Sequence, residues 1–102
     1  MGEKYEKLVR NKIPEILDAK KIPYEKRVAS PREYKTELIK KLKEEANEFA
    51  EAGSSEELAD VIEVVEALKE LLDFEKVEEI RIKKRGERGG FDSRVILKGE
   101  KG

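Results

Sequence analysis

Two pairs of acidic residues, each spaced three apart, lie close together in the sequence: Glu45 with Glu48, and Glu57 with Asp60. If both segments are helical and joined by a tight turn at Gly53, Glu48 faces Glu57 and Glu45 faces Asp60 across the hairpin. Four carboxylates at one height repel one another and lose solvation, unless they are protonated or share a cation. Carboxylate oxygens suit a hard divalent ion, so the pattern predicts a Mg²⁺ or Mn²⁺ site.

These acids coincide with apolar stripes instead of polar helix faces. At about 100° per residue, Glu45 lies about −20° from Leu38, in the middle of the apolar face of its helix. In the following helix, Glu57 lies about −40° from Val61. The second acid of each pair lies at the same edge of its stripe, at about −80° and −100°. The other glutamates of the second helix fall on its far face, as on an ordinary surface helix: Glu56, Glu63, Glu66 and Glu70.

Simpler explanations remain open for the individual acids. Glu57 lies three residues after Ser54 and fits a capping box. Glu45 and Glu48 also fit ion pairs with Lys41 on the same helix or with a basic residue from elsewhere. In a chain this rich in glutamate, one such pair is expected by chance. Two pairs, both in phase with the apolar stripe and matched across one turn, favour a metal site.

The helices that must position these acids follow from apolar residues recurring every three or four positions. We expect an all-α fold with helices at about 13–20, 31–52, 56–72 and 75–84. Ser30 is expected to cap the second helix, with Glu33 completing a capping box. Gly53 ends that helix, and Ser54 or Ser55 caps the next. The two long helices therefore form an antiparallel hairpin.

The C-terminal part is less regular. Its Val77-x-x-Ile80-x-Ile82 pattern fits a helix or the approach to a strand, and we favour a helix. The glycines at 86, 89 and 90 are expected to end regular structure. A short extended tail follows, with Phe91 as an apolar anchor and a frayed end at 99–102.

Length and composition limit what such a chain can be. Its 102 residues suit one domain, 1–102. Charged residues make up 46%, but Lys+Arg and Asp+Glu nearly balance, for a net charge of −1, so a basic nucleic-acid binder is unlikely. Without His or Cys there is no thiolate nucleophile, no Ser-His-Asp triad and no disulfide. Any chemistry therefore relies on carboxylates, Lys, Arg and Tyr.

The number and distribution of apolar residues predict a subunit partner and a cellular location. At 37% hydrophobic residues, a small chain is expected to complete its core with another subunit. The first residues, Met1 to Glu6, are polar, and no apolar run approaches the roughly 20 residues of a membrane span. We therefore expect a cytoplasmic protein. Abundant Glu and Lys with no Gln are typical of proteins from hot environments.

Three stretches together resemble a known family. The pattern Glu44-Glu45-x-x-Glu48 followed by Glu57-x-x-Asp60 is similar to the EExxE…ExxD signature of the MazG-like, all-α nucleoside triphosphate pyrophosphohydrolase superfamily. That superfamily also includes phosphoribosyl-ATP pyrophosphohydrolase. The stretches KLVRNKIP at 7–14 and KRGERGGF at 84–91 resemble its small single-domain branch. At Asn11 the family usually has Asp, and the gap between the two acidic halves is short here.

The resemblance implies Mg²⁺-dependent hydrolysis of the α–β phosphoanhydride of a nucleotide, which releases a monophosphate and pyrophosphate. Glu45, Glu48, Glu57 and Asp60 would then hold the metal, and Glu44 and Glu45 would be the catalytic acids, with Glu44 orienting the attacking water. The helices would form a bundle completed by a homodimer or a dimer of dimers.

Five basic residues are candidates for the substrate phosphates, since guanidinium groups bind phosphate oxygens in pairs: Arg10, Lys12, Lys84, Arg85 and Arg88. A solvated basic run is the simpler interpretation of those near the C-terminus. Two other functions remain open. One is phosphoribosyl-ATP hydrolysis in histidine biosynthesis, and the other is a non-catalytic helical interaction or regulatory dimer.

Overall fold

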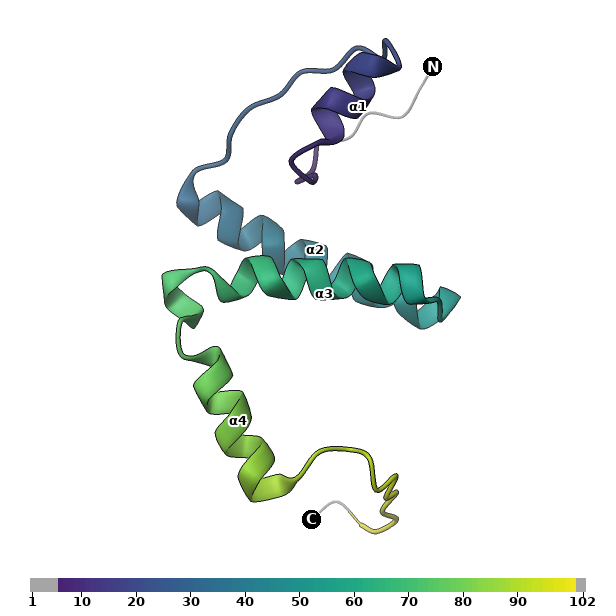
Figure 1. Cartoon of the computed structure of the whole chain (residues 1–102), viewed down its shortest axis with the longest axis vertical. Helices are drawn as coiled ribbons and strands as arrows, with labels where there is room; N and C mark the ends of the chain where they lie inside the picture. The colour runs from purple at the N-terminus through teal and green to yellow at the C-terminus, as the bar shows by residue number, and fades with distance from the viewer. Residues whose placement is uncertain (1–5, 101–102) are drawn as a thin grey trace.

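The computed structural model describes residues 6–100 and shows four α-helices and one short 3₁₀ helix: α1 (Ile13–Ala19), α2 (Pro31–Ala52), α3 (Ser55–Lys69), η1 (Leu72–Phe74) and α4 (Val77–Arg88) (Figure 1). Within this range there is no strand, so the all-α prediction is confirmed. Residues 1–5 and 101–102 lie outside it, with most of the polar N-terminal stretch and part of the end expected to fray. None of the helices described is both long and apolar enough to cross a membrane.

The N-terminus of α2 is capped largely as the sequence predicts. Ser30 has an extended backbone, and its Oγ accepts a hydrogen bond from the Glu33 N–H at 3.2 Å. Pro31 occupies the first helical position, where its missing N–H costs nothing. The Glu33 carboxylate accepts hydrogen bonds from Arg27 at 2.6 and 2.7 Å instead of closing the capping box.

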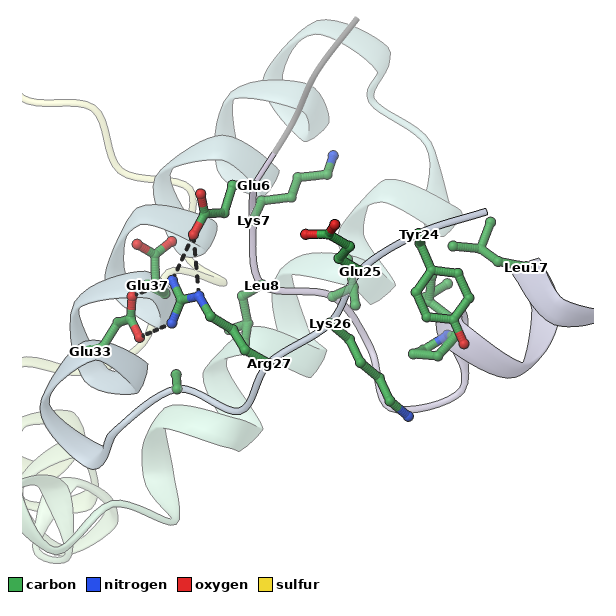
Figure 2. Close-up of a pocket in the computed structure, with 14 residues that line it drawn as sticks. Glu6, Lys7, Leu8, Leu17, Tyr24, Glu25, Lys26, Arg27, Glu33 and Glu37 are labelled. Carbon is green, nitrogen blue, oxygen red and sulfur yellow. Dashed lines mark hydrogen bonds and ion pairs between the residues drawn. The ribbon is translucent and has the colours of Figure 1, made fainter. Parts of the chain in front are cut away.

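Arg27 also fixes the N-terminal segment to α2. Its Nη2 donates to Glu6 Oε1 at 2.8 Å, so one guanidinium joins Glu6 to Glu33 (Figure 2). These contacts raise the pKa of Arg27, chiefly through Glu33, and lower the pKa of the Glu33 carboxyl. The chain before α1 and the connector after it are therefore tied together at the start of α2.

The turn between α2 and α3 matches the predicted hairpin. Gly53 has a left-handed backbone (φ +62°), and its N–H donates to the Phe49 carbonyl at 2.7 Å, which closes the end of α2. Ser54 is the residue that caps α3, because its Oγ accepts from the Glu57 N–H at 3.2 Å. The two helices then run side by side in opposite directions (Figure 1). This turn sets the register of the acids on both helices.

Replacing Gly53 with Ala is expected to lower the free energy of unfolding by roughly 1–2 kcal/mol, the cost of a left-handed backbone in a residue that has a Cβ. The added methyl group itself meets no atom within 4 Å. The matched control is Gly86→Ala, which also has open space but lies inside α4 and should stabilise by roughly 0.5–1 kcal/mol. Denaturant unfolding at one protein concentration measures both, and shifts of the same sign would contradict this interpretation.

Two of the expected boundaries are wrong. The second long helix ends at Lys69, not Leu72, because Leu71 adopts an extended backbone and Leu72 starts η1. The last helix does not stop at Gly86 but runs to Arg88 and ends where Gly89 takes a positive φ of 80°. A single glycine inside a helix costs only about 1 kcal/mol, which the helix-favouring neighbours of Gly86 offset.

Charged contacts attach α4 and η1 to the hairpin. Lys69 Nζ at the end of α3 lies 3.1 Å from Glu78 Oε1, and Arg81 Nη2 lies 3.0 Å from Glu78 Oε2. Lys35 on α2 pairs with Asp73 and lies 5.3 Å from the centre of the Phe74 ring. Beyond these contacts, α4 diverges from the hairpin (Figure 1).

The Glu78 contacts predict a pH dependence of stability. Hydrogen bonds from Arg81 and Lys69 lower the pKa of Glu78 from 4.5 to about 2. Because this pKa is lower in the folded state, the contribution is fully present above about pH 4.5 and is lost as the pH falls toward about 2. The midpoint temperature of thermal unfolding should be higher for wild type than for Glu78→Gln at pH 7, and the two should be equal near pH 2. The control is the exposed neighbour Glu79→Gln, and a gap that is constant with pH would refute the assignment.

Very little of the chain is buried within one copy. Within residues 6–100, the apolar residues that are buried are Leu38 on α2 (3% exposed) and Val64 on α3 (8% exposed). The chain exposes 10024 Å², whereas a compact monomer of this mass exposes about 5,900 Å². Its radius of gyration is 18.2 Å, against about 13 Å for a compact domain of this length. The C-terminal tail is equally uncovered, with Phe91 99% exposed.

Candidate metal site

Three carboxylates meet between the two long helices. Glu45 from α2 and Glu57 and Asp60 from α3 each offer one oxygen, and these three oxygens lie within 4.8 Å of one another. Glu45 is buried, with 7% of its surface exposed, while Glu57 and Asp60 are half-buried. The sequence predicted this convergence, and it depends on the turn at Gly53. We call these three residues the acid cluster.

Glu48, the fourth predicted ligand, lies at the edge of the acid cluster. It is exposed and is not among the three converging acids. Its pKa is nevertheless raised, chiefly by the charge of Glu45 and a hydrogen bond with it, and further by the charge of Glu57. The mutual repulsion expected between these acids is therefore present. Glu44, the residue before Glu45 on α2, is exposed, and its Oε1 lies 3.9 Å from Lys41 Nζ.

Two basic side chains partly neutralise the acid cluster. Lys41 Nζ lies 3.4 Å from Glu45 Oε1, and Arg10 Nη2 donates to Asp60 Oδ1 at 2.7 Å. The second oxygens of Glu45 and Glu57, both Oε2, remain buried without a hydrogen-bond partner. A buried acceptor left unsatisfied costs about 1–3 kcal/mol, and more if it is charged. Lys41 and Arg10 therefore leave part of the negative charge uncompensated.

The cluster fits a hard divalent cation. Its donors are all carboxylate oxygens, the ligands that Mg²⁺, Mn²⁺ and Ca²⁺ prefer. Two oxygens on opposite sides of Mg²⁺, at about 2.1 Å each, lie about 4.2 Å apart. The three oxygens all lie within 4.8 Å of one another, so one cation could contact all of them after small side-chain shifts. A cation between Glu45 and Glu57 would also satisfy the two unpartnered oxygens.

The simpler explanations for these acids hold locally but are incomplete. Ser54 does cap the Glu57 N–H, and Lys41 does pair with Glu45. The cap uses the backbone of Glu57, and the ion pair uses one of the two Glu45 oxygens. Neither contact provides a partner for the Oε2 atoms, so the case for a cation remains.

The basic residues proposed for the substrate phosphates are not all near the acid cluster. Arg10 reaches Asp60 directly. Lys12 is exposed just before α1 and does not line the cavity beside the cluster. Three others lie on the exposed second half of α4, which continues past the expected end at Lys84, and within one chain that helix leads away from the hairpin (Figure 1): Lys84, Arg85 and Arg88.

A cavity of about 380 Å³ lies beside the acid cluster. Glu45, Asp60 and Arg10 line it, and Tyr34 and Val64 add apolar surface. The sequence did not single out Tyr34 or Val64 for the site. For Tyr34 a signal existed, since it shares the helical face of Leu38 and Glu45.

Comparisons of the chain with protein-family models, with curated proteins and with solved structures found no match. What the acid cluster does is therefore inferred from its own chemistry. It combines an all-oxygen donor set with two unpartnered buried oxygens and an adjoining cavity that carries a guanidinium.

Proposed function

We propose that this chain is a Mg²⁺-dependent nucleoside triphosphate pyrophosphohydrolase of the MazG-like kind that its motifs resemble, with Mn²⁺ able to replace Mg²⁺. It cleaves the α–β phosphoanhydride and yields a nucleoside monophosphate and pyrophosphate. The observation that carries the proposal is the buried, unpartnered Oε2 of Glu45 within the acid cluster. A carboxylate oxygen buried there without a partner is costly, and a cation removes that cost.

The physical chemistry of the substrate agrees with this site. A nucleoside triphosphate carries about four negative charges, so an acid cluster binds it only through cations. A divalent cation would supply the positive charge that lets the phosphates approach the carboxylates, and it would activate water for hydrolysis. Glu45, Glu57 and Asp60 would hold it, with Glu48 at the edge. We assign Glu44, the exposed residue before Glu45, the role that the resemblance implies, which is to orient the attacking water and accept its proton.

The cavity beside the acid cluster suits the nucleoside part of the substrate. Its volume of about 380 Å³ falls within the roughly 300–1,000 Å³ of typical ligand sites. Tyr34, Leu38 and Val64 supply apolar surface for a base, while Arg10 lies where the cavity meets the cluster. In this proposal the phosphates bind at the acid cluster, and the base binds in the cavity beside it.

Pyrophosphate release tests the proposal directly. The protein is incubated with Mg²⁺ or EDTA and a panel of standard, deoxy and modified nucleoside triphosphates, together with phosphoribosyl-ATP. Release that needs Mg²⁺ is the expected result, and the best substrate distinguishes a nucleotide house-cleaning enzyme from the histidine-biosynthesis alternative. No release by a protein shown to be helical would instead favour a non-catalytic interaction dimer, the alternative that the exposed apolar surface supports.

We also propose that the active form is a homodimer or a dimer of dimers. The side of α3 that faces away from α2 exposes Leu58 (41%), Ile62 (51%) and Val65 (37%). The surface exposed beyond that of a compact monomer is about 4,000 Å² per chain, and obligate subunit interfaces bury about 2,000–5,000 Å² or more in total. A second copy is therefore the occupant that fits this face.

A further inference from the structure

The segment before α1 forms one wall of the cavity at the acid cluster. We call residues 6–12 the N-terminal strap. Leu8, Val9, Arg10 and Asn11 of the strap line the cavity opposite residues of α2 and α3. Among the contacts of the strap, Glu6 binds Arg27 at 2.8 Å, and Arg10 binds Asp60 at 2.7 Å. Of this pair, the Arg10 contact involves the acid cluster.

The Arg10 contact lies on one of the acids that a cation would use. Asp60 is one of the three converging acids, and the Arg10 guanidinium lies on its Oδ1. A divalent cation coordinated by Asp60 brings two positive charges next to that guanidinium and withdraws the negative charge that holds it. Arg10 and the cation therefore compete for Asp60.

Lys41 does not compete in the same way. It lies on the same helix as Glu45, pairs with Oε1 at 3.4 Å, and leaves Glu45 Oε2 free. Its side chain is 20% exposed, whereas that of Arg10 is 58% exposed. Arg10 is thus the more readily displaced of the two, and Arg27 keeps the strap tethered at Glu6 after Arg10 leaves.

We infer that Arg10 is the resident counter-cation of Asp60 and that a divalent cation displaces it, releasing this part of the strap from α3. The inference rests on the proposed metal site. Because coupling between two binding events is reciprocal, the cation weakens the strap contact by the same factor as the strap contact weakens cation binding. Displacement also leaves a guanidinium free at the cavity exactly when an anionic substrate can bind through the cation.

Titration of Mn²⁺ alone, followed by the paramagnetic resonance signal of free Mn²⁺, tests the competition. At low ionic strength Arg10→Met should bind Mn²⁺ roughly two- to fivefold more tightly than wild type, the range expected for an exposed ion pair. Arg27→Met removes the same charge from the other strap contact and is expected to leave the affinity unchanged. Equal or weaker binding by Arg10→Met would overturn the inference while wild-type binding still supports the proposed function.

Trypsin cleavage after Arg10 gives an independent measurement. Mn²⁺ should speed cleavage at Arg10 in wild type, as followed by mass spectrometry, and leave cleavage at Arg27 unchanged. In EDTA, trypsin should cleave Asp60→Asn at Arg10 as fast as it cleaves wild type with Mn²⁺. If Mn²⁺ binds wild type but leaves cleavage at Arg10 unaffected, the strap is not released and the inference fails. If wild type binds no Mn²⁺, the proposed function fails together with it.

Discussion

Replacing Glu45 with Gln is expected to reduce Mg²⁺-dependent pyrophosphate release by more than about 100-fold, since even residues that only orient metal ligands contribute about 10–100-fold. Glu45 is the most buried acid of the cluster and carries the unpartnered Oε2. Glutamine keeps its shape but removes the charge and places an amide among carboxylates. Mn²⁺ affinity should fall along with turnover.

The matched control for Glu45→Gln is Glu51→Gln, an exposed residue of the same helix. It removes the same charge from α2 and should keep turnover within about twofold, as expected for a surface change remote from the site. Circular dichroism of both variants checks the fold. Near-normal turnover by a folded Glu45→Gln variant would show that the acid cluster is not the catalytic centre.

Replacing Ile62 with Glu is expected to dissociate the assembly. Ile62 is 51% exposed in one chain, on the side of α3 that does not pack on α2. If that side is an interface between copies, an unpaired buried charge costs about 3–5 kcal/mol, which weakens association by roughly 10²–10⁴-fold. Light scattering coupled to size exclusion should show a multimer for wild type and a monomer for the variant.

Ala59→Glu is the control for this interface. Ala59 is also exposed on α3, about 60° further round the helix from Ile62 and on the polar side, so the same charge should leave the mass unchanged. A wild type that is monomeric at micromolar concentration would refute the interface. So would an Ile62→Glu variant with the wild-type mass.

Local signals predicted the hairpin and the acid cluster well. Ser30, Gly53 and Ser54 act within one turn of themselves, so the residue types alone predict where α2 begins and ends and where α3 begins. The turn in turn fixes the register of Glu45 against Asp60. A site built from two helices joined by two residues therefore needs little tertiary information.

The rotation of α3 was not predictable in the same way. Apolar residues cover most of its circumference, and their spacing predicts a packed face centred on Val61. In the structure Val64 is the buried residue, while Val65 is 37% exposed. The helix α3 has two apolar sides, of which one packs on α2 and the other is uncovered in one chain. Helical periodicity alone does not distinguish the packed side from the uncovered side.

The Arg10 contact and the placement of α4 depend on long-range geometry. Arg10 and Asp60 are separated by 50 positions, and no spacing rule joins them. Arg85 and Arg88 were expected beyond the last helix, where the glycines were expected to end regular structure. The helix instead continues through Gly86 and leads them away from the hairpin. Both outcomes depend on how elements pack, which local propensity does not determine.

Phosphorus NMR of the reaction tests the central claim most directly. The best substrate of the triphosphate panel is incubated with the protein and Mg²⁺, and the products are identified by their phosphorus resonances. We predict equal amounts of nucleoside monophosphate and pyrophosphate, with no reaction in EDTA. Nucleoside diphosphate with inorganic phosphate, or unchanged substrate beside a helical protein, would contradict the assignment of the acid cluster to α–β phosphoanhydride hydrolysis.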